Sequence, residues 1–319
     1  MIKKDLPYYL EKMKCLNIDK AHGPAPHKPT LLLSVIALIE EGQIQKNVVF
    51  CSEELKDTFG RYMVRVGDRR PNIWLPFFHL KTDKFWTHHP MPKQSDRLKR
   101  TRKIPTLARL NELISHVTLD EELFVFLTDA ISREKIRKTL IDTYFPELAG
   151  DLNDLISEEV EIADCTQELL KETEVPFEMV KLQAETTFRK SQVRKSGFSR
   201  LIKRLYDYTC VVCKLRVVTA EGNSASQAAH IISYRKLPID DVRNGISLCP
   251  FHHWAFDRGL ISLSDAYRVI VSRRLSKQRK TEWLLTDLRR KKILLPDRTQ
   301  NRPAPEAMAW HRENIFRQN

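Results

Sequence analysis

The stretch "LCPFHHWAFDRG", residues 248–259, decides how the C-terminal half of the chain is organised. It places Cys249 three residues before His252 and sets a second histidine, His253, directly beside the first. Neighbouring side chains on a helix point about 100° apart, because about 3.6 residues make one turn. Two adjacent histidines therefore rarely bind the same metal ion. We expect them to serve two different ions.

A second pair of thiols stands upstream, in "YTCVVCK". Cys210 and Cys213 have the same spacing as Cys249 and His252. Three thiolates and one imidazole in two such pairs suit a closed, tetrahedral structural zinc site. The spacing does not fit a DNA-reading zinc finger, which needs two histidines about three to five residues apart. Two unrelated pairs in a core remain the alternative, and we predict structural zinc.

Three polar residues are left outside this zinc set: His230 in "AAHII", Asn244 in "NGISLC" and His253 in "HHWAFDRGL". With the cysteine pairs, these motifs make residues 196–275 resemble an HNH endonuclease of the ββα-metal family. The resemblance implies that His230 is the general base that takes a proton from the attacking water. It implies that Asn244 fixes the loop carrying this histidine. His253 would bind a single divalent cation, Mg²⁺, Mn²⁺, Co²⁺ or Ni²⁺.

One position departs from many HNH enzymes, which carry an aspartate where this chain has Ala229. The branch that the motifs resemble shows alanine there, so we do not interpret it as inactivation. Fewer hard oxygen ligands would favour an ion softer than Mg²⁺. Asp257 is more readily explained by a structural role. Arg235 and Arg258 are candidates for holding the scissile phosphate, or solvated surface charges.

The N-terminal half carries two unusual segments, "GPAPHKPTLLL" at residues 23–33 and "WLPFFHL" at residues 74–80. Each is equally well explained as a loop that packs on a core. In this order, with "TYFP" further on and an HNH domain behind them, they resemble the sulfur-binding domain of phosphorothioate-dependent type IV restriction endonucleases. That family recognises DNA in which sulfur replaces a non-bridging phosphate oxygen. Sulfur is larger and less hydrated than oxygen, so an apolar cup favours it.

The resemblance also implies which residues contact the DNA. Leu75, Pro76 and His79 would line the cup, and His27 and Lys28 would reach phosphate and base edges. The family often has arginine at the position of Lys28, an aromatic residue at that of Leu75 and a small one at that of His79.

Further cations surround these segments. Arg61 and Arg65 lie one helical turn apart and would contact phosphates, or form a solvated face. Arg69, Arg70 and Lys81 bracket the second segment.

The composition favours a polyanionic partner. The 319 residues carry a formal net charge of +13, which favours nucleic acid before a membrane surface. The longest apolar run, residues 30–39, is too short to cross a bilayer. The N-terminus lacks the apolar centre of a signal peptide. We therefore expect a cytoplasmic protein that does not bind membranes and whose remaining cysteines are ordinary thiols.

These patterns predict an α+β fold of two domains. Residues 1–150 form a mixed α/β DNA-recognition domain, 151–195 a partly helical linker, and 196–319 the nuclease domain with C-terminal helices. Within the first domain we expect a helix over 5–16 and another ending at Gly42. Residues 70–90 should form a loop with short strands, and helices should run from about 105 to 146.

The function expected is a modification-dependent DNA endonuclease that recognises phosphorothioated double-stranded DNA and hydrolyses nearby phosphodiester bonds with a single metal ion. One such site cuts one strand, so we expect a homodimer, joined through the linker or the C-terminal helices. One alternative is an HNH restriction nuclease that recognises methylated or unmodified DNA. Another is a zinc-stabilised DNA-binding protein without catalysis.

Overall fold

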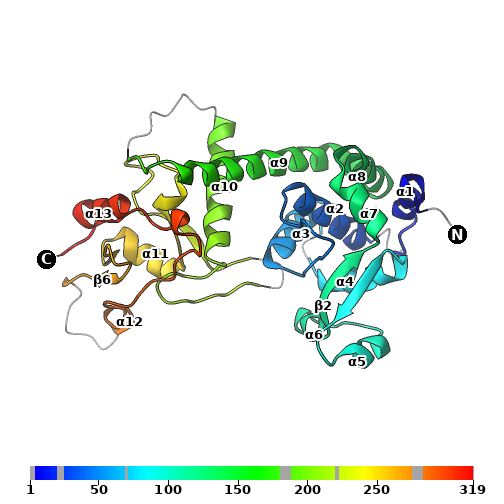
Figure 1. Cartoon of the computed structure of the whole chain (residues 1–319), viewed down its shortest axis with the longest axis horizontal. Helices are drawn as coiled ribbons and strands as arrows, with labels where there is room; N and C mark the ends of the chain where they lie inside the picture. The colour runs from blue at the N-terminus through cyan, green and yellow to red at the C-terminus, as the bar shows by residue number, and fades with distance from the viewer. Residues whose placement is uncertain are drawn as a thin grey trace. The chain divides into compact units, whose positions relative to one another are not determined.

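The structure is a computed structural model that describes residues 4–19, 25–68, 71–179, 188–219, 223–274 and 283–318. It divides into two compact units. Unit 1 comprises Met1–Val160 and Thr219–Asn223, and unit 2 comprises Glu161–Val218 and Ser224–Asn319. Both contain helices and short strands (Figure 1), which confirms the α+β, two-domain class. The expected helices around residues 279–296 lie partly outside the described residues.

Helices make up most of unit 1, with one two-stranded sheet among them (Figure 1). In chain order the elements are α1 Leu6–Lys14, α2 His27–Glu40, α3 Glu53–Arg65, α4 Trp74–His79, η1 Leu80–Asp83, β1 Trp86–Pro90, α5 Ser95–Arg100, α6 Leu107–Leu113, β2 Ile114–Leu119, α7 Glu121–Thr128, α8 Ala130–Tyr144, η2 Pro146–Leu148 and α9 Ala149–Lys171, which continues into unit 2.

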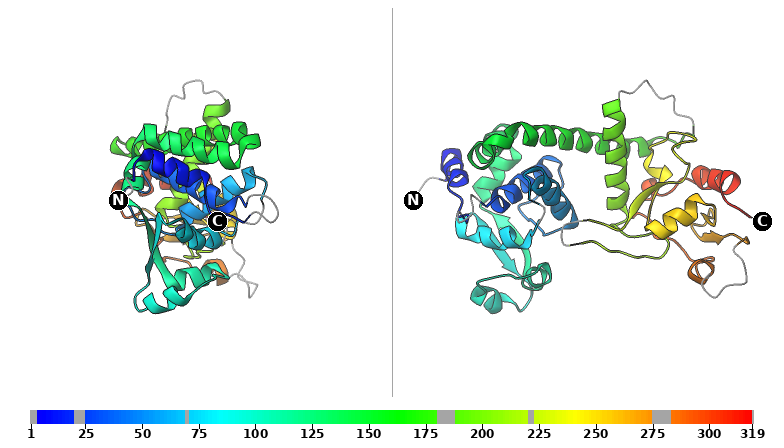
Figure 2. Two further views of the ribbon diagram at one scale, coloured as in Figure 1. Left: turned by 90° about the vertical axis from the view of Figure 1, so that its right-hand side faces the viewer. Right: turned by 180° about the vertical axis from the view of Figure 1, so that it is seen from behind.

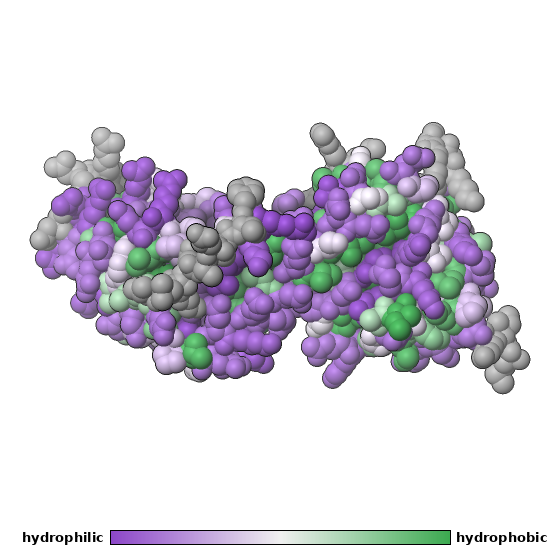
Figure 3. Space-filling model, turned by 90° about the horizontal axis from the view of Figure 1, so that it is seen from above, coloured by the Kyte–Doolittle hydropathy of each residue, from purple (hydrophilic) through white to green (hydrophobic). Residues whose placement is uncertain are grey.

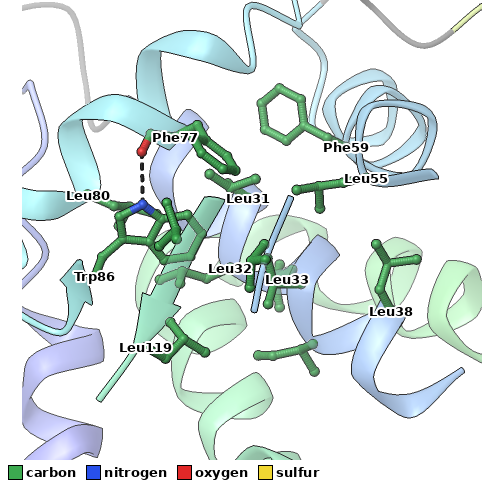
Figure 4. Close-up of a cluster of buried hydrophobic side chains, with 14 of the residues drawn as sticks. Leu31, Leu32, Leu33, Leu38, Leu55, Phe59, Phe77, Leu80, Trp86 and Leu119 are labelled. Carbon is green, nitrogen blue, oxygen red and sulfur yellow. Dashed lines mark hydrogen bonds between the residues drawn. The ribbon is translucent and has the colours of Figure 1, made fainter. Parts of the chain in front are cut away.

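The core of unit 1 forms around α2, whose residues from Lys28 to Ile39 are all buried. A helix that is apolar on every side must be enclosed by other elements, and α3, α4, α7 and α8 enclose it. Figure 4 shows Leu31 between Phe59 and Phe77 in this core. Trp86 of β1 donates its indole N–H to the backbone oxygen of Phe77, at 2.9 Å. This bond satisfies the indole nitrogen and joins β1 to α4.

Two elements of unit 1 differ from the sequence expectation. Residues 74–79 form the short helix α4 rather than a loop. Pro76 lies in the first turn, where a helix needs no N–H donor, and the burial of Phe77 and Phe78 outweighs the low helix propensity of aromatic residues. Residues 114–119 form strand β2 rather than helix, because they pair antiparallel with β1, with Trp86 opposite Leu119. A partner so distant in sequence leaves no local signal.

The segment expected to be a linker begins with α9, one continuous helix of 23 residues. The boundary between the two compact units falls at residue 160, within this helix. Glu159 of α9 is buried and accepts two hydrogen bonds from Arg61 of α3, which fixes the first part of α9 on unit 1.

Unit 2 combines two small hairpins with helices. Its elements are η3 Glu172–Glu174, α10 Phe188–Leu205, β3 Gln227–His230, η4 Val242–Asn244, β4 Gly245–Leu248, α11 Pro250–Asp257, β5 Ile261–Leu263, β6 Val269–Val271, α12 Trp283–Thr286, η5 Thr299–Asn301 and α13 Pro305–Asn314.

Strands β3 and β4 pair antiparallel, with His230 opposite Gly245, and α11 follows β4 directly. The stretch "GISLCPFHHWAFDRG" changes from strand β4 to helix α11, and the antiparallel hairpin of β5 and β6 follows it. Gly245 lets α10 approach the hairpin, because a Cβ at this position would lie 2.3 Å from Cδ1 of Ile202. The ββα arrangement is therefore packed tightly on α10.

The surface in Figure 3 is mainly hydrophilic, with hydrophobic residues scattered over it. None of the helices in the described ranges has both the length and the apolar character that crossing a membrane requires. The cytoplasmic location expected above stays a prediction.

Candidate functional site

The predicted zinc ligands come together in unit 2. The ligand atoms of Cys210, Cys213, Cys249 and His252 all lie within 4.8 Å of one another. Sγ of Cys249 is 3.1 Å from Nδ1 of His252, and Sγ of Cys213 is 3.9 Å from Sγ of Cys249. Ligands about 2.3 Å from a tetrahedral centre lie roughly 3.7 Å apart. The four side chains therefore fit a zinc ion.

The charges of these thiols also favour a cation among them. Burial, together with the neighbouring Cys210 thiol, raises the pKa of Cys213 to about 12. Burial and Cys210 raise the pKa of Cys249 as well. Burial acts in the same direction on Cys210, but hydrogen bonds from His252 and from backbone amides outweigh it and lower its pKa to about 6. Three thiolates this close need a positive charge between them, which zinc supplies.

His230 stands at the end of β3, where a buried carboxylate holds its ring. Nε2 of His230 lies 2.8 Å from Oδ1 of Asp240, whose side chain is 3% exposed. Phe198 of α10 stacks on the imidazole, with ring centroids 4.2 Å apart. Because Nε2 donates its proton to the carboxylate, Nδ1 carries the free lone pair. The ring is thus fixed in orientation and in tautomer, as a general base requires.

Asn244 organises the loop that follows His230. Its side-chain oxygen accepts a hydrogen bond from the backbone N–H of Ile232 at 2.7 Å. Its side-chain nitrogen donates to the backbone oxygens of Ile232 at 3.2 Å and Ile239 at 2.9 Å. Asn244 is fully buried, so these bonds replace all the water that the amide has lost. The side chain of Asn244 thereby ties together the backbone at Ile232 and Ile239.

Helix α11 points its two histidines in different directions. His252 is buried at the thiol cluster, whereas His253 is partly exposed. Nδ1 of His253 lies 2.8 Å from Oε1 of Gln227, which leaves Nε2 available as a ligand. That Nε2 lies 3.6 Å from Oδ2 of Asp257, one turn further along the helix. A nitrogen of His253 and a carboxylate oxygen of Asp257 thus lie close together on one face of α11.

A cavity of about 440 Å³ adjoins these groups. His230, Tyr234, Arg235 and Asp257 line it, together with Ile231, Ser233, His311 and Ile315. The expected base thus shares one cavity with the carboxylate of Asp257 and the guanidinium of Arg235. Ala229 is fully buried in the core, so the position before His230 provides no ligand.

In unit 1, the residues expected to form a cup lie on α4. The side chain of Leu75 is 37% exposed, Pro76 is buried, and His79 is partly buried at the end of the helix. Burial lowers the pKa of His79, and the charges of Lys28, Lys81 and Lys103 lower it further. The imidazole is therefore neutral, which suits a weakly hydrated ligand.

Lys28 is placed differently from the expectation. It is 7% exposed, and its Nζ lies 2.6 Å from Oδ2 of Asp83. Nζ also donates to the backbone oxygen of Asn17 and to Oγ1 of Thr82. All three ammonium protons are used inside the unit, so Lys28 has none left for a phosphate.

Arg61 is also committed internally, to Glu159, Asp57 and Thr58. Arg65 is exposed and makes no ion pair within the described part of the chain. His27 opens α2 and lies 3.6 Å from Asp68. Arg69, Arg70 and the start of "GPAPHKPTLLL" lie outside the described residues.

Two family models match the chain. Residues 210–264 match the HNH endonuclease family, and residues 7–160 match the ScoMcrA-like DNA sulfur-binding domain family. Neither match covers half of the chain; together they link a region similar to DNA sulfur-binding domains to one similar to HNH endonucleases. Both resemblances predicted from the sequence motifs are thereby confirmed. The sulfur-binding match ends at the residue where the contacts divide the chain.

One solved structure similar to the chain is a "Modification dependent TagI restriction endonuclease", with 19% sequence identity and a TM-score of 0.30. The match covers 38% of this chain and 38% of that one, so the chain spans less than half of that protein. No curated protein matches the chain.

Sequence reasoning missed three residues at these sites. Asp240 is the first of two adjacent aspartates, and the second, Asp241, pairs with Arg243 instead. Nothing in "PIDDVRN" tells which of the two faces the HNH histidine. Gln227 starts strand β3 without any motif of its own. Lys81 was noted only as a flanking charge.

Proposed function

We propose that the protein is a modification-dependent DNA endonuclease. The sulfur-binding domain would recognise phosphorothioated double-stranded DNA, and the HNH domain would hydrolyse phosphodiester bonds nearby. The observation that carries this proposal is the constrained pair of His230 and Asp240, which opens into the cavity shared with Asp257. A zinc-stabilised DNA-binding protein without catalysis needs no such pair.

His230 performs the proton transfer in this proposal. Its Nδ1 takes a proton from a water molecule, whose oxygen attacks the phosphorus. The bond from phosphorus to the 3′ oxygen then breaks, and the leaving oxygen takes a proton from a solvent water molecule, which leaves a 5′-phosphate and a 3′-hydroxyl. Asp240, on Nε2, keeps the ring in the correct tautomer and stabilises the imidazolium as it forms. Arg194 lies 3.6 Å from the other oxygen of Asp240, on the side away from His230.

We propose that His253 and Asp257 hold the catalytic divalent cation, with water in the remaining positions. Gln227 orients His253 so that Nε2 points toward Asp257. Such an ion, Mg²⁺, Mn²⁺, Co²⁺ or Ni²⁺, would stabilise charge on the pentacovalent phosphate and on the leaving oxygen. Zinc on the four ligands of the cysteine cluster would hold the start of α11 in place.

In the sulfur-binding domain, Leu75, Pro76 and His79 remain our candidates for the cup. We propose Lys81, rather than Lys28, as the cation that holds the phosphate beside it. Its Nζ lies 3.7 Å from the centre of the Phe78 ring, and burial lowers its pKa. A cation near an apolar surface binds a phosphorothioate through charge and sulfur contacts together. His27 and Arg65 are further candidates for phosphate contact.

A basic segment between β1 and β2 supports DNA as the partner. Helices α5 and α6 lie at the end of unit 1 away from α8 (Figures 1 and 2). Five exposed cations of this segment form no ion pair within the described residues: Lys93, Lys99, Arg100, Arg102 and Lys103. Lys103 is near enough to His79 to lower its pKa, so these charges continue from the cup. Such a track matches a phosphate backbone.

One HNH site with one metal ion cuts one strand. A double-strand break needs two sites, and we propose that two copies of the chain act together.

The test separates binding from cleavage. Two duplexes of identical sequence, one with a single Rp phosphorothioate, are offered to the wild type and to His230→Ala with Mn²⁺ or Mg²⁺. We expect both proteins to bind only the sulfur duplex and only the wild type to cut it. Equal cutting of both duplexes would reject sulfur recognition and leave recognition of a methylated or unmodified sequence. Binding without cutting under any divalent ion would reject catalysis.

A further inference from the structure

Helix α11 presents three faces, two of which are already explained. Its inward face carries His252, Ala255 and Phe256, which are buried. With about 100° between successive residues, His253 and Asp257 share a second face. Trp254 lies roughly 60° beyond Asp257 around the helix, and Phe251 roughly 60° beyond Trp254. These two aromatic side chains form a third face, next to the metal-binding one.

The third face is apolar and exposed. Trp254 is 52% exposed and Phe251 is 42% exposed. Their rings are nearly parallel, with centroids 6.3 Å apart and 22° between the planes. Exposed apolar residues that occur singly need no explanation, but two large aromatic rings that adjoin each other and a catalytic face do. Arg258, directly after the helix, is exposed and makes no ion pair with any described residue.

We propose that Trp254 and Phe251 stack on nucleobases next to the scissile phosphodiester and partly unstack that base step. This inference rests on the proposed nuclease function and adds how the HNH domain selects the bond it cuts. A phosphate bound in the cavity that His230 and Asp257 line would lie against helix α11, the helix that also carries Trp254. Aromatic side chains inserted at a base step kink the duplex, which aligns the phosphate with the site.

The small area of the face formed by Trp254 and Phe251, and the positive charge beside it, favour DNA over a second copy of the chain as its partner. Aromatic side chains have about 150–250 Å² each, so the two exposed portions offer roughly 200 Å². A stable protein interface needs about 800 Å² from each partner. The cation at Arg258 also suits a polyanion, and the whole chain carries a net charge of +13.

The proposal predicts a preference among base steps. Steps of pyrimidine followed by purine, such as TA and CA, are the easiest to unstack. The wild type should therefore cut these steps most often, at whatever distance from the sulfur the two domains allow. Loss of one aromatic residue should remove this preference.

The experiment uses the full chain with zinc, as wild type, Trp254→Ala, Trp254→Phe and Phe251→Ala. The matched control is Phe50→Ala, because Phe50 is equally exposed but belongs to unit 1. Cut positions are mapped on duplexes that carry one phosphorothioate and varied flanking steps. In a His230→Ala background, 2-aminopurine at the preferred step reports unstacking through its fluorescence, without any cleavage.

We expect Trp254→Ala to cut about 5- to 150-fold more slowly, from the stacking contribution of one base. It should lose the step preference and the fluorescence rise, while it still binds the sulfur duplex in preference to the oxygen duplex. Trp254→Phe should keep most of the step preference and most of the fluorescence rise. Phe50→Ala should behave as wild type. Unchanged cut positions and fluorescence in Trp254→Ala would overturn the proposal. So would a dimer in the wild type that becomes a monomer in this variant.

Failure of the proposed function would look different. A wild type that never cuts, yet unstacks 2-aminopurine through Trp254, would keep this inference and reject catalysis. A wild type that cuts without sulfur dependence leaves the step preference testable in the same way.

Discussion

Replacing Asp240 with asparagine should reverse the tautomer of His230. In the protein, one oxygen of Asp240 accepts from Nε2 of His230 and the other faces Nε of Arg194. In Asp240→Asn, Arg194 can only donate, so it draws the amide oxygen toward itself. The amide nitrogen then faces His230 and donates to Nε2. This forces the imidazole proton onto Nδ1, the atom that must accept a proton from water.

The expected loss is large. General-base catalysis contributes roughly 10²- to 10⁴-fold, and the equivalent change in serine proteases costs about 10⁴-fold through the wrong tautomer. We expect Asp240→Asn to cut about 10³-fold more slowly, equivalent to about 4 kcal/mol of transition-state stabilisation. Binding of the sulfur duplex should stay the same, because Asp240 is not in unit 1.

Single-turnover cleavage and ¹⁵N NMR of labelled histidine measure the two effects. The rate should fall, and the protonated nitrogen of His230 should change from Nε2 to Nδ1. Asp241→Asn is the control, since the side chain of Asp241 pairs with Arg243 rather than with His230. It should lower stability and leave the cleavage rate of the folded protein intact. Cleavage by Asp240→Asn within about threefold of wild type, with Nε2 still protonated, would refute the reasoning.

Three further predictions concern stability and the cup. Removal of zinc with a chelator, or the substitution Cys213→Ser, should lower the Tm of unit 2 by about 10 °C. The reason is that a structural zinc contributes several kcal/mol to the free energy of unfolding. An unchanged Tm in calorimetry would argue against a bound metal. Burial lowers the pKa of His311 to about 4 from 6.5, so the unfolded chain gains a proton first. The contribution of His311 to the free energy of unfolding should therefore be complete above pH 6.5 and fall by up to about 3 kcal/mol as the pH drops to 4. Urea titrations of the wild type and of His311→Gln would measure this loss. An equal loss in both proteins would reject this assignment. Lys28→Met should destabilise unit 1 by about 3–5 kcal/mol by leaving Asp83 unpaired, whereas Lys81→Ala should keep the Tm and weaken DNA binding. Titrations that found Lys28→Met as stable as wild type would contradict the internal ion pair.

The HNH half was largely predictable because its chemistry needs fixed residues at fixed spacings. Two pairs of metal ligands can bind one ion only if the turn and the helix carrying them adopt defined conformations. The positions of His230, Asn244 and His253 follow from the same hairpin and helix. Asp240 was not predictable, because its role depends on a loop whose path Asn244 sets through long-range hydrogen bonds.

The recognition half was less predictable because its roles depend on burial. Lys28 and Lys81 look alike in sequence, yet one is enclosed with Asp83 and the other lies on an aromatic ring. Helix α4 also arose where prolines and aromatics suggested a loop, since packing of Phe77 and Phe78 decided its conformation. Local propensity carries no information on such tertiary partners.

The central claim is that sulfur in the backbone directs an HNH cut. Its most direct test is the ratio of single-turnover cleavage rates for two duplexes that differ only in one Rp phosphorothioate, with full-length protein and Mn²⁺. We expect fast cutting of the sulfur duplex, little cutting of the oxygen duplex, and none of either by His230→Ala. Equal wild-type rates on both duplexes would contradict it.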